Sequence, residues 1–233
     1  MRKSFLRRAQ HLPPSPWNRN VNAQTERLTL TGAAGAIEAL RDAAQLAEGQ
    51  APRGVAIIAH PHPLFGGSMD NKVVQTLARA FVHSGFTAVR FNFRGVGASA
   101  GVHDAGQGEL QDLLAVVQQV APEGPIALAG FSFGAFVTSH ALAQLWPEGR
   151  VERAVLVGTA TSRFAVADVP AEAQQRTLVI HGEADDTVPL ASVMDWARPQ
   201  ILPVTVVPGG GHFFHGQLPL LKSLVARHLL PGL

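Results

Sequence analysis

Short apolar runs alternate with segments of helical periodicity along most of the 233-residue chain, and this alternation constrains the fold more than any other feature. Residues 54–60, GVAIIAH, form a continuous apolar run, which is typical of a strand buried on both faces. In residues 70–85 the apolar side chains recur at helical spacing, with Asp70 or Ser68 placed to cap the start and Gly85 to follow the end. The alternation predicts an α/β fold in which helices cover both faces of a mostly parallel, doubly wound sheet.

The remaining segments continue this alternation, and the chain as a whole predicts about eight strands. Residues 26–40 predict two strands joined by a Gly-rich turn, an antiparallel hairpin at the edge of the sheet. Further strands are predicted over residues 86–93, 125–130, 152–158, 176–182 and 202–209, and further helices over residues 108–120, 133–146 and 218–230. In such sheets the reactive residues lie on loops that follow the carboxyl ends of the strands. Candidate catalytic residues are therefore expected on the few loops that follow these strands.

Composition and charge predict one globular domain behind a basic extension. Hydrophobic residues make up 46% of the chain and charged residues 15%, which predicts a large buried interior. Residues 1–20 hold five of the 19 basic residues and no acid, so the rest of the chain has 14 basic residues against 17 acidic ones. We therefore expect residues 1–20 to be a basic N-terminal extension and residues 21–233 to be a single domain that does not bind nucleic acid.

Targeting signals and cysteine are both absent from the sequence. The opening lacks the run of about 7–15 apolar residues of a secretory signal, and its prolines interrupt the amphipathic helix of an organelle transit peptide. No stretch reaches the roughly 18 apolar residues of a membrane span. The chain has no cysteine, which excludes thiol catalysis, disulfides and thiolate metal sites. We expect a cytoplasmic protein with no membrane partner.

The sequence contains two Gly-x-Ser-x-Gly motifs, centred on Ser132 and Ser99, and their contexts separate them. A nucleophile elbow needs a strand directly before the serine and a helix directly after it, because the sharp turn then exposes the hydroxyl. Ser132 has both, and its flanking glycines remove side chains where strand, helix and turn crowd together. Ser99 follows a strand but leads into a glycine-containing segment that delays any helix. Ser132 is therefore the predicted nucleophile, and the segment around Ser99 is predicted to be a loop.

A serine nucleophile needs a histidine base and a carboxylate that orients the base. In this architecture the order along the chain is serine, acid, histidine, each after a later strand. Asp185 and Asp186 follow the strand after next, and their spacing does not separate them; one is expected to act and the other to cap the helix that Pro189 opens. His212 lies on the following strand-exit loop after three glycines, and it is the predicted base.

The other histidines have simpler structural interpretations. His215 lies where the last helix begins and is expected to be a turn or capping residue. His181 precedes the acid at the end of its strand and is expected to pack or hydrogen-bond locally, and His140 is expected to be a core histidine with a partner. A metal-dependent hydrolase is an alternative, which would draw its ligands from His60, His62, His212, His215, Asp185 and Asp186. This alternative leaves the serine turn unexplained.

Attack on a carbonyl produces an oxyanion, which needs two backbone N–H donors. One donor is expected from Phe133, directly after the nucleophile. The second is expected from residues 60–67, HPHPLFGG, in which the two prolines have no N–H to donate. His62 and Leu64 are the candidates that remain.

Five segments in order resemble the α/β-hydrolase family, in a bacterial branch similar to dienelactone hydrolases: HPHPLFGGSMDNKVV, RFNFRGVGASAG, GFSFG, HGEADDTVP and GGGHFFHG. The resemblance covers nearly everything after the basic opening and implies the α/β-hydrolase fold. The family pattern His-Gly-x-x-Asp-x-x-Val-Pro implies Asp185 as the acid, and the start of the oxyanion loop implies the His62 N–H as the second donor. Pro61 departs from the pattern, because many members have glycine there, and it makes the loop stiffer.

These observations predict a serine hydrolase that cleaves small or soluble acyl esters or thioesters through an acyl-enzyme. Ser132, His212 and Asp185 form the predicted triad, and the His62 and Phe133 N–H groups form the predicted oxyanion hole. Residues 158–175 leave room for only one short helix, so we expect a minimal lid or none. No cofactor or metal is expected, and the oligomeric state is left open. An amide- or peptide-cleaving hydrolase and a catalytically silent binding protein are the alternatives.

Overall fold

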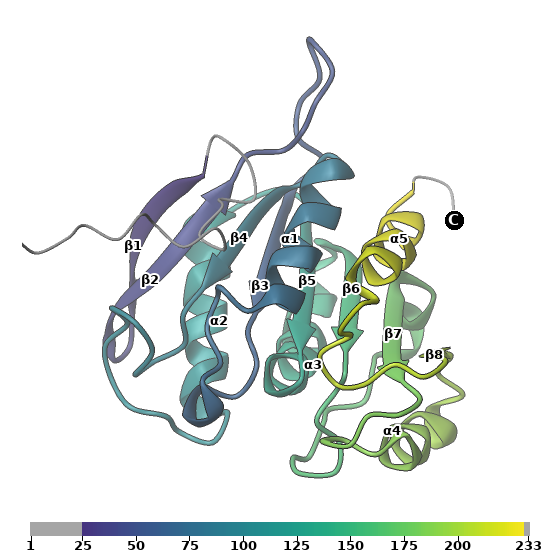
Figure 1. The fold of residues 1–233 in the computed structure, drawn as a ribbon. Helices are drawn as coiled ribbons and strands as arrows, with labels where there is room; N and C mark the ends of the chain where they lie inside the picture. Colours follow the sequence, from purple (N-terminus) through teal and green to yellow (C-terminus); the bar gives the residue numbers. More distant parts are fainter. Residues whose placement is uncertain (1–24, 231–233) are drawn as a thin grey trace, which may run out of the picture.

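An eight-stranded sheet forms the centre of the computed structural model, which describes residues 25–230 (Figure 1). The predicted basic extension, residues 1–20, lies outside the described residues. The strands are β1 (Glu26–Gly32), β2 (Gly35–Asp42), β3 (Val55–Ala59), β4 (Thr87–Phe91), β5 (Ile126–Phe131), β6 (Val151–Val157), β7 (Thr177–Gly182) and β8 (Val204–Val207), in the order β1-β2-β4-β3-β5-β6-β7-β8. The β1–β2 and β2–β4 pairs are antiparallel, and the other pairs of this sheet are parallel. The mostly parallel sheet and its edge hairpin are confirmed.

Helices cover both faces of this sheet and enclose two apolar cores (Figure 1). One face carries α1 (Lys72–His83) and α5 (Leu218–His228), and the other carries α2 (Gln107–Val120), α3 (Phe133–Leu145) and α4 (Leu190–Ala197). Phe81 and Leu221 are fully buried on the first face, and Leu113 and Leu142 on the second. Each such side chain contributes about 1.5–3 kcal/mol on burial, so both cores hold the sheet rigid beneath its exit loops.

The start of α1 differs from the sequence prediction. Asn71, and neither Asp70 nor Ser68, caps the helix, because its Oδ1 accepts a hydrogen bond from the Val73 N–H at 2.9 Å. Ser68 instead accepts from the Asp70 N–H within the preceding turn, and Asp70 forms an ion pair with Arg90. Both predicted caps are therefore engaged elsewhere.

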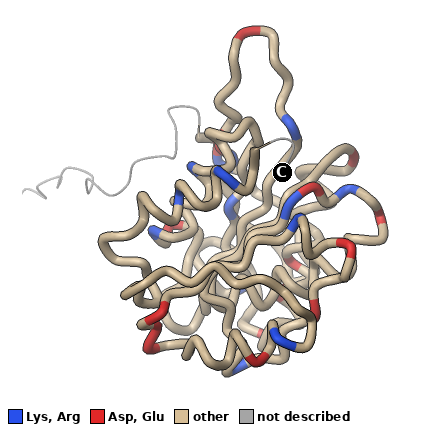
Figure 2. The backbone as a smooth tube through the Cα atoms, turned by 90° about the vertical axis from the view of Figure 1, so that its right-hand side faces the viewer, with Lys and Arg blue, Asp and Glu red and all other residues tan. Residues whose placement is uncertain are grey.

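Among the residues that the structure describes, no large insertion covers the carboxyl edge of the sheet. The connection between β6 and β7 contains a single short 3₁₀ helix, η3 (Ala171–Arg176), in agreement with the predicted absence of a lid. Within residues 25–230, no helix is long and apolar enough to cross a membrane. Figure 2 shows acidic and basic positions interspersed around the described chain.

Candidate active site

Ser132 stands on a strained turn between β5 and α3. Its φ of 58° and ψ of −116° lie outside the regions that side chains prefer, and its N–H donates to the Val157 carbonyl at 2.8 Å. A Cβ at Gly130 would meet the Gly134 carbonyl oxygen at 2.3 Å, and one at Gly134 would meet the Ala59 carbonyl oxygen at 2.4 Å. Only glycine fits where β5, α3 and β3 approach, as the sequence predicts for this turn.

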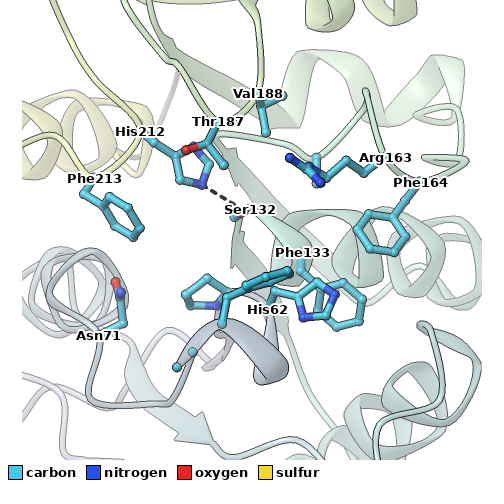
Figure 3. A pocket seen from close by; sticks show the side chains of 15 residues that line it. His62, Asn71, Ser132, Phe133, Arg163, Phe164, Thr187, Val188, His212 and Phe213 are labelled. Carbon is cyan, nitrogen blue, oxygen red and sulfur yellow. Dashed lines mark hydrogen bonds between the residues drawn. The ribbon is translucent and has the colours of Figure 1, made fainter.

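The structure brings Ser132 together with the predicted base and acid. The Ser132 hydroxyl lies 3.0 Å from Nε2 of His212 (Figure 3), and Nδ1 of His212 lies 2.7 Å from Oδ2 of Asp185. The three residues come from the loops after β5, β8 and β7, and each is less than a tenth exposed. The donor and acceptor pattern requires the Nδ1–H tautomer, which leaves the Nε2 lone pair free to accept the serine proton.

Asp185 is held as a carboxylate by its neighbours. Its Oδ1 accepts hydrogen bonds from the Thr187 and Val188 N–H groups at 3.0 and 2.8 Å. Burial would raise the pKa of Asp185, but the hydrogen bonds from His212 and Val188, together with the nearby His212 and His181 rings, outweigh burial and lower the pKa. The acid is therefore charged at neutral pH, as an orienting carboxylate must be.

Asp186 does not cap the next helix, and that part of the prediction is wrong. Pro189 occupies the N-cap position of α4 and makes no side-chain capping bond, whereas Asp186 accepts a hydrogen bond from its neighbour Thr187 at 3.3 Å. The turn that holds the Asp185 carboxylate directs Asp186 to the solvent. The spacing in the sequence could not show whether Asp185 or Asp186 contacts His212. In the structure Asp185 makes this contact and Asp186 is exposed.

The remaining candidate residues take structural positions. His181 donates through Nε2 to the Val188 carbonyl at 2.8 Å and lies 3.4 Å from Asp185, so it supports the loop of the acid. His215 is exposed in a turn, and His140 lies 2.8 Å from the Ala165 carbonyl oxygen on a partly buried helix face. Ser99 is buried in its loop and donates to the Asn92 carbonyl at 2.7 Å. Among residues 25–230 no three His, Cys, Asp or Glu side chains gather as a metal site would require.

The backbone N–H groups of Phe133 and His62, two residues that line the cavity with Ser132, have no acceptor within residues 25–230. Phe133 is the first residue of α3, so its N–H precedes the helical hydrogen bonds. The Leu64 N–H donates to Nδ1 of His62 at 3.2 Å, which removes Leu64 as a donor. The arrangement supports His62 and Phe133 as the oxyanion donors.

The His62 ring packs in an aromatic cluster at the base of this loop. Its centroid lies 4.7 Å from that of His103 and 4.9 Å from that of Phe133. Burial lowers the pKa of His62, and the neighbouring His103 and Arg163 side chains lower it further. Nδ1 of His103 lies 2.8 Å from the buried Glu109 carboxylate, whose opposing charge does not overcome these effects. His62 is therefore mostly neutral at pH 7 and can accept from Leu64.

The loop that carries His62 is anchored from below by His60. Nδ1 of His60 donates to the Pro61 carbonyl at 2.6 Å, and its Nε2 accepts from the Phe93 N–H at 3.0 Å. Both ring nitrogens are thus engaged in the neutral form. Burial lowers the pKa of His60 to about 4.

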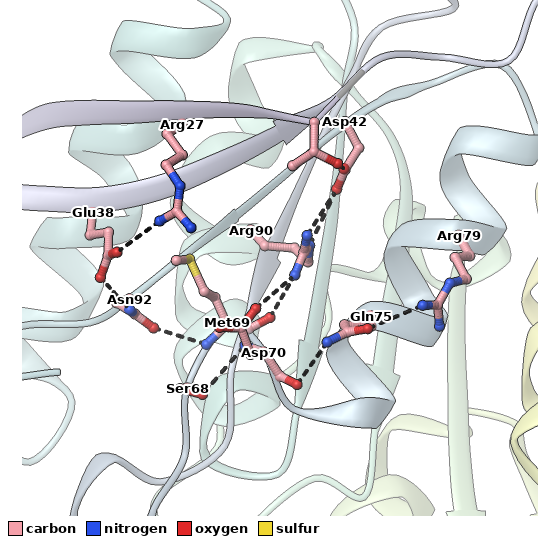
Figure 4. Close-up of polar contacts among 11 residues, drawn as sticks. Arg27, Glu38, Asp42, Ser68, Met69, Asp70, Gln75, Arg79, Arg90 and Asn92 are labelled. Carbon is pink, nitrogen blue, oxygen red and sulfur yellow. Dashed lines mark hydrogen bonds and ion pairs between the residues drawn. The ribbon is translucent and has the colours of Figure 1, made fainter. Parts of the chain in front are cut away.

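The far end of the same loop is anchored by Arg90. This guanidinium is 2% exposed and lies 3.2 Å from Asp42, which is fully buried (Figure 4). It also donates to the Met69 carbonyl at 3.0 Å and lies 3.4 Å from the Asp70 carboxylate. The ion pair of β4 and β2 therefore holds the segment that leads into α1, beside the pocket residue Asn71.

A cavity of about 250 Å³ opens above Ser132 and His212. Aromatic side chains form much of its wall, and the sequence analysis did not assign several of the lining residues: Phe65, Asn71, Arg163, Phe164, Thr187 and Phe213. Phe213 could have been inferred from its place after His212. Arg163 and Phe164 lie in an irregular connection, where no periodicity indicates the direction of a side chain.

Comparisons with known proteins place this chain in a family. A family model described as serine aminopeptidase, S33, matches residues 50–165. A lidless α/β serine hydrolase from Xanthomonas campestris is 37% identical, with a TM-score of 0.79 over 91% of this chain and 98% of that one. An α/β serine hydrolase homologue from Coxiella burnetii is also 37% identical, with a TM-score of 0.74 over 88% and 97%.

Two further proteins are similar to this chain in the fold alone or over only part of its length. An esterase from Pyrococcus furiosus, 17% identical, shares the fold alone, with a TM-score of 0.66 over 88% of this chain and 91% of that one. An uncharacterized protein from Rickettsia prowazekii is 44% identical over 87 residues, and that match covers 36% of this chain and 37% of the relative.

The sheet order and the strained serine turn define an α/β-hydrolase fold. Because relatives at 37% identity match nearly their whole length, the chain belongs to the family of α/β serine hydrolases. The narrower resemblance to dienelactone hydrolases stays a prediction.

Proposed function

We propose that this protein cleaves small or soluble acyl esters or thioesters through an acyl-enzyme, without a cofactor. The observation that carries the proposal is the chain of contacts from Asp185 through His212 to Ser132, at 2.7 and 3.0 Å. Geometry of this kind activates a hydroxyl that is otherwise a weak nucleophile. The open cavity beside Ser132 favours compact substrates over long lipids.

In the first half of the reaction, Nε2 of His212 accepts the Ser132 proton while Oγ bonds to the carbonyl carbon. The carbonyl oxygen becomes an oxyanion and accepts hydrogen bonds from the His62 and Phe133 N–H groups. Asp185 stabilises the imidazolium that forms. The carbon–oxygen or carbon–sulfur bond of the leaving group then breaks, and His212 returns the proton to the departing alcohol or thiol.

In the second half, water replaces the leaving group. Nε2 of His212 takes a proton from the water as its oxygen bonds to the acyl carbon, and the same two N–H groups bind the second oxyanion. The bond between the acyl carbon and Oγ breaks, Ser132 regains its proton from His212, and the acid is released. The cycle consumes one water and needs no further reactant.

Replacing Ser132 by Ala tests the nucleophile. Because triad members act as a unit, we expect turnover of 4-nitrophenyl acetate to fall by about 10⁶-fold, and labelling by a fluorophosphonate to be lost. The matched control is Ser99→Ala, the serine of the second motif, which should still be labelled when its circular dichroism shows a folded protein. Retained labelling in Ser132→Ala would contradict the assignment. A folded wild type that reacts with neither reagent would favour a silent binding protein.

An amide- or peptide-cleaving hydrolase is the second candidate, which the serine aminopeptidase family model favours. The same triad serves both reactions, so the fold does not choose between them. Matched acyl 4-nitrophenyl esters, thioesters and 4-nitroanilides of graded length distinguish them. We expect the kcat/KM of esters and thioesters to exceed that of anilides by far more than their intrinsic reactivity does. A cytoplasmic location, and the absence of membrane or nucleic-acid partners, are part of this proposal.

A further inference from the structure

One charged side chain lines the cavity without a role in the reaction described above. Arg163 comes from the connection between β6 and β7, and Figure 3 shows its guanidinium directed toward the space around Ser132. Its side chain has no ion pair or hydrogen bond with any residue in the part of the chain that the structure describes. The residues that line the cavity include no Asp or Glu. A guanidinium without a partner in an acid-free cavity is suited to bind an anion.

Aromatic rings lie next to Arg163. The next residue, Phe164, has its ring centroid 5.2 Å from that of Phe133 and 5.9 Å from that of His62. On its other side Phe164 stacks on Phe136, with centroids 4.7 Å apart. A planar apolar group fits beside these rings, with its charged end at the guanidinium.

Electrostatics in the cavity point the same way. Burial lowers the pKa of the His62 ring, and the nearby His103 and Arg163 side chains lower it further, so the ring is mostly neutral at pH 7. The permanent charge among the lining residues is therefore the guanidinium of Arg163. An anionic substrate meets attraction in this cavity, and a cationic one meets repulsion.

The position of His212 assigns this subsite to one half of the substrate. His212 delivers its proton to the leaving group, so the leaving group lies on the His212 side, where the Phe213 centroid is 5.1 Å from the His212 ring. In Figure 3, Arg163 and Phe164 lie on the opposite side of Ser132 from His212 and Phe213. The subsite at Arg163 therefore faces the acyl group.

We propose that Arg163 selects acyl groups that combine a short planar apolar body with a terminal carboxylate or similar anion. This proposal rests on the proposed function and names the substrate class of the same site. Arg163 is then a residue that determines specificity by contact with the substrate.

Three esters with one leaving group test the selection: 4-nitrophenyl benzoate, its 4-carboxylate derivative and its 4-trimethylammonium derivative. We expect Arg163→Gln to lower kcat/KM for the carboxylate ester about tenfold, the effect of one charge-assisted hydrogen bond, and to change the neutral ester by less than about twofold. Arg163→Glu should reverse the preference toward the cationic ester. Comparing each ester across the variants cancels differences in intrinsic reactivity.

Arg198→Gln is the control, because it removes another exposed arginine that does not line the cavity. It should leave the ratio between the three esters unchanged. Added salt should weaken the anion preference of the wild type and have little effect in Arg163→Gln. An anion preference that is absent from the wild type, or that survives in Arg163→Gln, overturns the proposal.

Binding to Ser132→Ala separates this proposal from the proposed function. Calorimetry should show monomethyl terephthalate binding about tenfold tighter than neutral dimethyl terephthalate, and Arg163→Gln in the same background should remove the difference. If no ester is hydrolysed but this difference is present, the hydrolase assignment fails and the anion subsite stands. If the two ligands bind equally in both proteins, the anion subsite is wrong whatever the catalytic result.

Discussion

Single glycines set the geometry of the reactive turn. The Cα of Gly134 packs against the backbone of the β3 exit, where an added Cβ would lie 2.4 Å from the Ala59 carbonyl oxygen and 2.5 Å from that of His60. Backbone atoms cannot move aside as a flexible side chain can. The strain at Ser132 is therefore maintained by close packing of three backbone segments.

We expect Gly134→Ala to destabilise the protein by about 1–3 kcal/mol, because the methyl group overpacks this junction. Esterase activity should fall as well, since α3 and the Phe133 N–H would shift. Urea denaturation measures the first effect and steady-state kinetics the second. Gly211→Ala is the control, because a Cβ there meets nothing within 4 Å. Equal stability of the two variants would contradict the crowding argument.

The sequence was sufficient to predict which side chains meet at the strained serine turn, but not all of their surroundings. Ser132 and His212 could be chosen because each follows a strand in the required order. The choice of Asp185 needed the family resemblance, since the residues alone did not separate it from Asp186. The position of Arg163 in the cavity could not be predicted. The direction of a loop side chain depends on tertiary packing, and a loop has no regular periodicity that would indicate it.

At the scale of elements, the loop before α1 is held between two buried anchors, His60 and Arg90. His60 fixes the end nearest His62, and Arg90 fixes the end nearest Asn71. The sequence did not suggest this role for Arg90, which lies in an otherwise apolar strand. Its partner Asp42 belongs to the edge hairpin, far away in sequence.

We expect Asp42→Ala to cost about 3–5 kcal/mol of unfolding free energy, because it leaves the Arg90 guanidinium buried with only the exposed Asp70 as a carboxylate partner. Arg90→Met combined with Asp42→Ala should cost less than the sum of the two single changes. A double-mutant cycle by urea denaturation measures this coupling. Additive losses would show that the ion pair does not act as a unit.

Element types were predicted better than element ends. The strands and helices follow from apolar runs and periodicity, whereas the cap of α1 depended on competition among Ser68, Asp70 and Asn71 for backbone and side-chain partners. Each of the three has suitable chemistry for a cap. Tertiary contact with Arg90 engages Asp70, and that contact is not visible in a local sequence window.

For the whole molecule, buried histidines set the response to acid. The pKa of His60 is about 4 in the folded protein and near 6.5 when unfolded, so between these values the unfolded chain binds more protons. Stability is therefore fully present above pH 6.5 and falls as the pH drops to about 4. Burial shifts His62, His181 and His228 in the same direction, and below about pH 4 protonation of Asp185 adds a further loss.

We expect the contribution of His60 alone to be about 3 kcal/mol between pH 6.5 and 4. His60→Gln should lower stability at pH 7, because the ring makes two hydrogen bonds, but it should flatten the pH dependence by about one proton. Urea unfolding at a series of pH values measures both. An unchanged slope in the variant would show that His60 does not remain neutral in the folded state.

The fold class was predictable because alternation along the chain leaves few ways to cover a parallel sheet. The cavity was not predictable from the sequence. Its walls come from five separate loops, which come together only once the sheet has formed. The proposed triad thus depends on the order of strands in the sheet, whereas the shape of the cavity depends on the packing of its loops.

The connection between β6 and β7 carries Arg163 and Phe164 but none of the residues of the proposed triad. If Arg163 selects the acyl group as proposed, exchange of this one segment would alter which substrates are accepted, while the residues of the proposed triad stay on other loops of the sheet. New substrate ranges could therefore arise in this scaffold through changes in a surface loop, with little loss of stability.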